Sequence, residues 1–249
     1  MNTKFYSLLI PFFSGISTTI GFLPIFISKK YQNILIPFSL SFSAGVMIFL
    51  SCFSLIPEAF LCLKTKDFLH QVLLTIISIL IGFFLSSYID MKIETKIKTN
   101  SLYKLGILSI IVLILHNIPE GITTYLTTEA NYSLGISLAF AIALHNIPEG
   151  IAIAIPIYYS TKDKKKAFNY TFISGFSEFL GAIFAYLFFK NYINKLLLFY
   201  LFSTTAGIML HLSFIDLLPN SFQYKKKKTS LLGFALGSLI MILCLSILH

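Results

Sequence analysis

The chain has 249 residues, of which 56% are hydrophobic and only 12% are charged, about half the charged share of soluble globular domains. This composition, with a mean hydropathy of +0.83, excludes an ordinary soluble protein and predicts an integral membrane protein. The net charge of +9 would suit a nucleic-acid partner. However, the lysines flank apolar runs in short loops, where membrane topology and anionic membrane lipid explain them, so no nucleic-acid partner is expected.

Eight apolar runs are each long enough to cross about 30 Å of hydrocarbon as a helix. They cover residues 5–27, 34–61, 69–91, 102–126, 133–159, 167–189, 196–218 and 230–248. The first run is longer than the apolar part of a signal peptide and has no cleavage signal, so we expect it to remain a membrane span. Because the connections are short, residues 1–249 are predicted to form a single all-α membrane domain.

The lysines are divided unequally between two sets of loops. If successive loops alternate between the two sides of the membrane, 14 of the 19 lysines fall on one side and five on the other. The positive-inside rule then places the lysine-rich side in the cytoplasm and both termini outside. The plasma membrane is the default location for such a protein.

The second and seventh runs resemble each other. The segment AGVMIFLSCFSLIPEAF at 44–60 aligns without gaps with AGIMLHLSFIDLLPNSF at 206–222, and eight of the 17 positions are identical. Because four spans separate them, the two helices run in opposite directions. This pattern predicts an inverted repeat of the kind found in many secondary transporters, whose substrate sites lie near the middle of the bilayer.

The octapeptide LHNIPEGI occurs at 115–122 and again 29 residues later, in the fourth and fifth runs. Residues four apart lie on one face of a helix, so His116 is placed beside Glu120, and His145 beside Glu149. The proline in each copy removes a helical hydrogen bond and predicts a kinked, broken helix beside a polar cavity. The glycine after each glutamate predicts the close approach of a neighbouring helix.

An antiparallel pairing of the fourth and fifth helices would bring the two copies to similar depth, where two imidazoles and two carboxylates converge. Such nitrogen and oxygen ligands suit zinc and other first-row divalent ions. A bound cation would also offset the cost of a charged side chain at mid-membrane, on the order of 2.5 to 3.5 kcal/mol. A structural hydrogen bond between helices is the alternative for a single His–Glu pair, and the identical second copy favours metal ligation.

Other polar residues are weaker members of this set. Glu178, in the segment SGFSEFLGA, is the only charged residue in more than 20 positions and is predicted to be a further ligand on a tightly packed helix. Asn117 and Asn146 follow the histidines and are candidate oxygen ligands of an adjacent second ion, with ordinary interhelical hydrogen bonding as the alternative. Asp216 and His211 are candidates for the transport path, with a role as interior polar residues as the alternative.

The motifs HNIPEG in the fourth and fifth runs, SEFLGA in the sixth and AGIMLHLSFIDLLP in the seventh resemble the Zrt/Irt-like (ZIP) family of divalent-metal transporters. The resemblance covers essentially the whole chain and is strongest to the bacterial and archaeal branch. It implies eight transmembrane helices in a 3+2+3 inverted repeat, both termini outside, and import of zinc or iron. It also implies that the first, fourth, fifth and sixth helices move past the other four.

The resemblance also assigns the ligands. The primary metal site would consist of His116, Glu120, His145, Glu149 and Glu178. An adjacent second site would use Asn117 and Asn146 and share carboxylates with the first. The chain departs from the family at Ser54, where close relatives often have an acidic residue, and at Asp216, where Glu is common. Asn146 also replaces the Asp of some members, so fewer carboxylates are available to a second ion.

The leading prediction is therefore a secondary-type transporter that imports divalent cations, zinc first and iron or manganese as alternatives. The metal is its substrate, and no catalytic cofactor is expected. Because the ligands must be deprotonated to bind metal, transport is expected to weaken in acid. An intramembrane zinc-dependent hydrolase is the alternative, although the H-E-x-x-H motif is absent. A proton-coupled transporter of an organic substrate and a homodimeric assembly also stay open.

Overall fold

The computed structural model describes residues 3–27, 31–63, 67–96, 101–189 and 195–248. Almost all of these residues are helical, and no strand occurs among them. Eight helical stretches within them are long and apolar enough to cross a membrane. These stretches are Tyr6–Phe26, Gln32–Cys62, Phe68–Lys92, Leu102–Glu129, Gly135–Thr161, Lys164–Phe188, Lys195–Gln223 and Lys227–Ser246. The predicted all-α membrane protein with eight spans is confirmed, whereas Lys29, Lys30, Lys64, Lys66, Lys98 and Lys190 of the predicted loops lie outside the described residues.

Several spans combine more than one helical element. The first span consists of α1 (Thr3–Ile16) and the 3-10 helix η1 (Ser17–Phe26). The second consists of α2 (Gln32–Leu50), η3 (Ser51–Leu55) and α3 (Ile56–Cys62). The third is α4 (Phe68–Lys96). The fourth and fifth are α5 (Ser101–Ala130) and α6 (Tyr132–Thr161). The sixth span consists of α7 (Lys164–Phe184) and η4 (Ala185–Phe189). The seventh consists of α8 (Lys195–His211), η5 (Leu212–Leu217) and α9 (Leu218–Gln223). The eighth is α10 (Lys227–Leu248).

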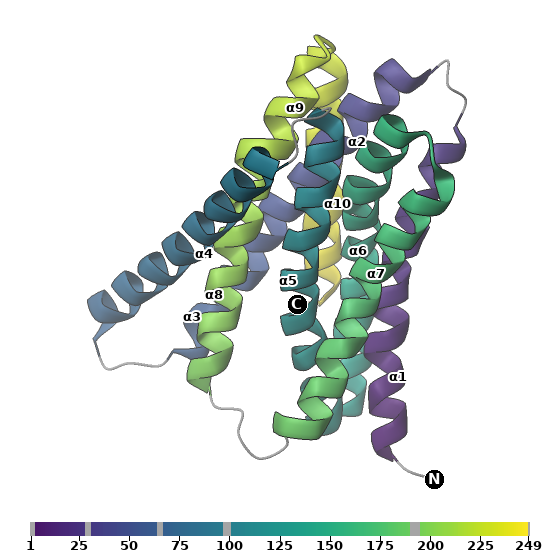
Figure 1. The fold of residues 1–249 in the computed structure, drawn as a ribbon. Coiled ribbons are helices and arrows are strands. Elements are labelled where there is room, and N and C mark those ends of the chain that lie inside the picture. The colour runs from purple at the N-terminus through teal and green to yellow at the C-terminus, as the bar shows by residue number, and fades with distance from the viewer. Residues whose placement is uncertain (1–2, 28–30, 64–66, 97–100, 190–194, 249) are drawn as a thin grey trace.

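The helices pack as two groups (Figure 1). In the first group, α1 and η1 pack against α6 and α7, and α5 packs against both α6 and α7. In the second group, α2 packs along α10, and α8 packs along α4 and α3. The two groups meet mainly where α2 contacts α6 and where α5 contacts α8.

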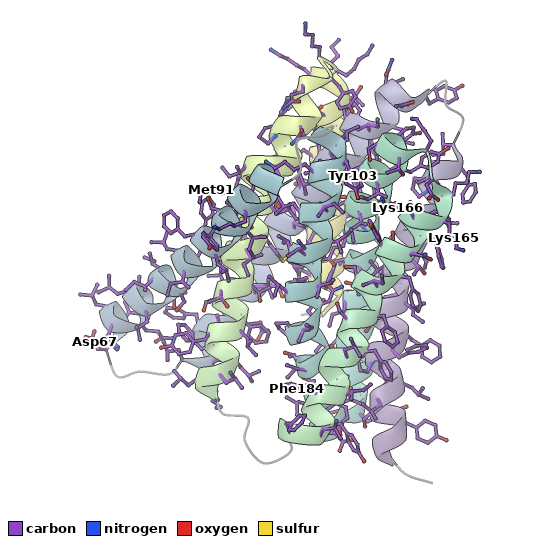
Figure 2. The ribbon with its side chains drawn as sticks, in the orientation of Figure 1. Asp67, Met91, Tyr103, Lys165, Lys166 and Phe184 are labelled. Atoms are coloured by element: carbon purple, nitrogen blue, oxygen red, sulfur yellow. The ribbon has the colours of Figure 1, made fainter. Side chains whose placement is uncertain are left out.

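The two ends of the molecule carry different sets of helix termini (Figure 1). The N-terminus lies at the lower end, together with the end of α3 and the start of α8. The lysines that begin α7 lie at the upper end, where Lys166 Nζ donates a hydrogen bond to Tyr103 Oη at 3.1 Å. Figure 2 shows these two residues together, far from Phe184 at the other end of α7. In the same view α4 leans away from the other helices between Met91 and Asp67.

Close contacts of glycines join the helices of the second group. Gly45 of α2 lies against α10, and an added Cβ there would be 2.5 Å from the carbonyl oxygen of Phe234. Gly207 of α8 lies against α4, and its Cβ would be 2.0 Å from the carbonyl oxygen of Ile79. Gly45 and Gly207 occupy the same position in the aligned segments 44–60 and 206–222. Each therefore makes the same kind of close contact, with α10 in one case and α4 in the other.

The partner helices return the same contacts. A Cβ at Gly237 of α10 would lie 2.1 Å from the carbonyl oxygen of Phe42 in α2, and one at Gly82 of α4 would lie 1.9 Å from that of Thr204 in α8. Phe42 and Thr204 each stand three positions before the aligned glycine of their own helix. The pair α2 and α10 and the pair α8 and α4 therefore pack through matched positions.

The prolines of the two LHNIPEGI copies do not break their helices. α5 continues as an α-helix through Pro119, and α6 continues through Pro148, so the predicted break at these positions is wrong. π-Helical turns that precede a proline occur instead in the second and seventh spans, where η3 and η5 end just before Pro57 and Pro219. A π-helical turn contains an extra residue, and it gives the proline ring room that a regular α-helix lacks.

Hydroxyl groups of neighbouring helices donate to the backbone of α6 around its proline. Ser17 Oγ donates to the carbonyl oxygen of Ala143 at 2.9 Å, and Ser43 Oγ donates to that of Pro148 at 2.6 Å. Pro148 leaves the carbonyl of Leu144 without its helical donor, and the two hydroxyls donate to other carbonyls of the helix, so they do not replace the missing bond. They attach α6 to η1 in one group and to α2 in the other.

Candidate metal centre

The two LHNIPEGI copies face each other across α5 and α6, as the sequence predicts. His145 Nε2 lies 2.8 Å from Glu120 Oε1. His116 Nε2 lies 3.1 Å from Glu120 Oε1 and 3.3 Å from Glu149 Oε1. The four side chains are buried, and the two imidazole rings are 6.3 Å apart between centroids. Each histidine therefore approaches the glutamate of the opposite helix.

Several polar atoms of this group have no hydrogen-bond partner among the described residues. They include Nδ1 of both histidines, Oε2 of Glu120 and both carboxylate oxygens of Glu149. One ligand atom each from His116, His145 and Glu149 lies within 4.8 Å of the other two. Because buried polar atoms are normally paired, this set of nitrogen and oxygen atoms suits a divalent cation such as zinc.

Glu178 adds a third carboxylate from α7. It is fully buried, its Oε1 accepts a hydrogen bond from Ser14 Oγ, and its Oε2 accepts one from Asn146 Nδ2 at 2.8 Å. Glu120 and Glu149 are close enough for their negative charges to repel that of an ionised Glu178. Three buried carboxylates repel one another when ionised, so the group requires cations or protons to offset its charge.

The two asparagines use the nitrogen and the oxygen of the amide differently. Asn117 Nδ2 donates to the carbonyl oxygen of Ser174 at 2.8 Å, and Asn146 Nδ2 donates to that of Ser14 at 3.0 Å. Both Oδ1 atoms are buried and have no partner in the described part of the chain. The amide nitrogens thus make the interhelical bonds that were the alternative interpretation, while the amide oxygens stay available to a ligand.

The glycine after each glutamate allows a neighbouring backbone to reach the centre. A Cβ added at Gly121 would lie 1.7 Å from the carbonyl oxygen of Glu178, and one added at Gly150 would lie 1.9 Å from that of Thr18. Neither contact has room for a side chain. The predicted close approach is confirmed, and it brings α7 onto α5 and η1 onto α6.

The sequence reasoning missed the contribution of the first span. Ser14 contacts Glu178 and Asn146 as described above, and Thr18 is fully buried beside Gly150. The signal lies in a second internal match, since SGISTTIG at 14–21 and SGFSEFLG share Ser, Gly, Ser and Gly at equal spacing. In this alignment Thr18 occupies the position of Glu178.

His211 and Asp216 belong to a second polar group, between α8 with η5 and α4. His211 Nδ1 lies 3.7 Å from Asp216 Oδ2 and 3.0 Å from Ser86 Oγ. The imidazole also packs edge to face on the Phe83 ring, with 4.9 Å between centroids. These contacts fit the interior polar role that was the alternative for His211, whereas a role in the transport path stays a prediction.

A cavity of about 250 Å³ reaches the centre from one end of the molecule. It extends from the exposed Glu58 of α3 to the buried Glu120 and His145. The side chains that line it are Leu50, Ser54, Leu55, Glu58, Glu120, Thr123, Thr127, Leu138, Ile142, His145, Phe202, Met241 and Leu245. Glu58 belongs to α3, the short helix that ends the second span, so the cavity reaches the end of the molecule that also carries the N-terminus (Figure 1).

The part of the chain that the structure describes contains eight apolar helices long enough to span a membrane and a buried group of His and Glu side chains, which defines a multi-pass integral membrane protein. Residues 90–245 match the model of a family described as ZIP Zinc transporter, and the chain belongs to this family. This membership confirms the resemblance found in the sequence. The family consists of transporters and not of enzymes, so the hydrolase alternative is set aside.

Several similar proteins match over nearly their full length. The zinc transporter ZupT of Oceanobacillus iheyensis is 37% identical over 273 residues, which cover 100% of both chains. The zinc transporter ZupT of Streptococcus mutans is 36% identical, and the match covers 95% of this chain and 95% of the relative. That of Campylobacter jejuni is also 36% identical, and the match covers 98% of this chain and 97% of the relative.

Proposed function

We propose that this chain imports divalent metal cations, zinc first, into the cytoplasm. The proposed ligands are His116, Glu120, His145, Glu149 and Glu178. One observation carries the proposal: two imidazoles and two carboxylates converge from α5 and α6 in a buried group, and several of their atoms lack hydrogen-bond partners among the described residues. The relatives named as zinc transporters support zinc as the substrate, and iron and manganese are the alternative ions for such ligands.

The charge of the group supports more than one bound ion. Two neutral imidazoles and three ionised carboxylates carry a charge of about −3, which one divalent ion offsets only in part. The amide oxygens of Asn117 and Asn146, which have no partner among the described residues, are the ligands we propose for a second ion beside the first. His211 and Asp216 are proposed to line the path on the other side of the centre.

The paired contacts support an inverted repeat. α2 with α10 and α8 with α4 pack through matched glycines, and the aligned second and seventh spans each contain a π-helical turn before a proline. We therefore propose a 3+2+3 arrangement in which α1, α5, α6 and α7 form one unit and the other spans form the second. Transport would move the first unit, with its bound ion, along the second.

The direction of transport rests on the lysines and on the cavity. The cavity reaches the end of the molecule to which the lysine count assigns the outside, and where the N-terminus lies. An ion would therefore reach Glu120 and His145 from outside the cell. We place the protein in the plasma membrane, and its exposed apolar side chains, such as those of α4, would contact lipid or a second copy.

Uptake into liposomes tests this function. Purified protein is reconstituted, and the uptake of zinc, iron and manganese is compared among the wild type, His145→Ala and Glu149→Ala. His70→Ala is the matched control, because His70 is exposed at the start of α4. Saturable uptake that is lost in both centre variants and kept in the control is expected. Undiminished uptake in His145→Ala and Glu149→Ala would contradict the proposal.

A further inference from the structure

The mouth of the cavity carries an acidic residue that belongs neither to the buried centre nor to its hydrogen-bonded neighbours. Glu58 lies in the first turn of α3, is exposed, and lines the same cavity as Glu120 and His145. Among the described residues that line this cavity, Glu58 and Glu120 are the two acidic ones. One carboxylate therefore stands at the solvent end of the cavity and the other at the buried end.

Polar groups continue between these two carboxylates. Ser54 precedes Glu58 by four residues, and both line the cavity from the second span. On α5, Thr123 and Thr127 line the cavity beyond Glu120, three and seven residues along the helix, a spacing that keeps all three on one face. Oxygen atoms thus follow both sides of the cavity from its mouth toward the centre.

We propose that Glu58 captures the incoming divalent cation at the mouth of the cavity and thereby lowers the concentration at which transport reaches half its maximum. This inference rests on the proposed function and assigns to that function a residue outside the buried centre. The carboxylate attracts a hydrated cation through solvent, and the cation then moves inward past Ser54 and the α5 threonines to Glu120 and His145.

The surroundings of Glu58 favour such a role. Most of the remaining lining is apolar, including Leu50, Ile142 and Phe202, and a cleft with low-dielectric walls focuses the field of a charge and raises the local concentration of counter-ions. Because Glu58 is exposed, its attraction for the cation is weakened by water and salt. It therefore holds the ion only briefly, which a capture site requires.

The sequence explains why this residue was not singled out. Glu58 lies near a span end, where an interfacial position is the ordinary interpretation of an acidic residue. At the aligned position of the seventh span the chain has Asn220, so the repeat places no acid at the position equivalent to Glu58. Only the shared cavity relates Glu58 to Glu120.

The test compares zinc uptake kinetics of the wild type and Glu58→Gln in liposomes. At low ionic strength we expect the KM of Glu58→Gln to rise about three- to ten-fold, at or below the lower end of the roughly 10- to 1,000-fold range of electrostatic focusing, because one exposed charge is removed. Vmax should change less than about two-fold. The increase should shrink at high salt, because screening removes the contribution of an exposed charge. Glu58→Asp should keep a KM close to that of the wild type.

The matched control is Glu129→Gln. Glu129 is also exposed near the same end of the molecule, but it lines a different pocket with Tyr6, Ser7, Thr128 and Tyr132. Its KM should stay that of the wild type. An equal KM increase in this control would attribute the effect to general surface charge and overturn the proposal.

Two further outcomes would also overturn it. An unchanged KM in Glu58→Gln would show that the cation does not need this carboxylate, and the function of the buried centre would stand. A lowered Vmax at constant KM, at low and high salt alike, would assign Glu58 a structural role in α3. Absence of uptake by the wild type is a different result, because it would overturn the proposed function and with it this inference.

Discussion

The first and sixth spans pack on the two motif helices in the same way but carry different charges. The backbone at Thr18 lies against Gly150 of α6, and the backbone at Glu178 lies against Gly121 of α5. The two spans also touch each other through Gly15 and Gly175, where a Cβ on either would lie 2.3 or 2.2 Å from the carbonyl oxygen of the other. The positions of these backbones are thus set by small residues in both spans.

The side chains at the two equivalent positions differ in size, charge and hydrogen bonding. Glu178 accepts hydrogen bonds from Ser14 and Asn146, whereas Thr18 Oγ1 is buried without a partner among the described residues. The comparison teaches that packing and charge are specified separately. Equivalent backbone contacts are compatible with a carboxylate in one span and a hydroxyl in the other, so the third carboxylate of the centre is not a requirement of packing.

The largest effect on stability and uptake is expected at the two glycine contacts, where the comparison predicts that the first and sixth spans behave alike. Gly121→Ala and Gly150→Ala should both lower stability by about 1 to 3 kcal/mol, the usual range for overpacking, and both should abolish metal uptake. Thermal unfolding in detergent and liposome uptake measure these effects, with the exposed Ser137 of α6 changed to Ala as the control. If Gly150→Ala keeps stability and uptake while Gly121→Ala loses both, the two contacts are not equivalent.

The next effect separates the two side chains. Glu178→Gln removes a carboxylate from the centre and should weaken zinc binding at least ten-fold, which corresponds to about 1.4 kcal/mol. Thr18→Val keeps the shape and removes a hydroxyl that has no partner among the residues the structure describes, so binding and stability should change little. Calorimetric titration with zinc measures both. If Thr18→Val weakens binding as much as Glu178→Gln, the first span also supplies a ligand.

An exchange of the two side chains sharpens the comparison further. Thr18→Glu combined with Glu178→Thr should recover part of the zinc affinity lost in Glu178→Thr alone, because Asn117 donates to the carbonyl of Ser174 as Asn146 donates to that of Ser14. A recovery of a few-fold in affinity, measured by the same titration, is expected. If the double variant unfolds at an unchanged temperature but its zinc affinity does not recover, the two spans are equivalent in their backbone contacts only.

The smallest effect concerns the serines next to these positions. Ser14→Ala removes a hydrogen bond to the Glu178 carboxylate and should weaken zinc binding several-fold, on the order of 1 kcal/mol. Ser174 Oγ is buried and has no partner in the described part of the chain, so Ser174→Ala should leave binding unchanged. Equal effects of the two substitutions on the zinc titration would contradict a specific role of Ser14.

The sequence predicted those parts of the centre that depend on local spacing. His116 and Glu120 share a helix face because they are four residues apart, and the second copy of the motif repeats this relation in the opposite helix. The close approach at Gly121 and Gly150 also followed from residue type. These features need only helical geometry and an antiparallel pair of helices, both of which the pattern of apolar runs and motifs contains.

Other features depend on contacts between distant segments, and the sequence did not reveal them. Pro119 and Pro148 indicated broken helices, whereas α5 and α6 continue through them and pack against each other and against neighbouring helices. Ser14 and Thr18 lie in an apolar span where serine and threonine are common, so only alignment with the sixth span singles them out. The amide orientation of Asn146 is set by the carbonyl of Ser14, 132 residues away.

The size of the cavity has a consequence for which ions complete the passage. A volume of about 250 Å³ has room for several water molecules, each of which occupies about 30 Å³ in the liquid. An ion can therefore travel most of the way with much of its hydration shell and lose that water only beside Glu120 and His145. Magnesium, which gives up its water reluctantly and prefers oxygen ligands, is expected to enter the cavity and return. Zinc is expected to exchange water for imidazole and to proceed.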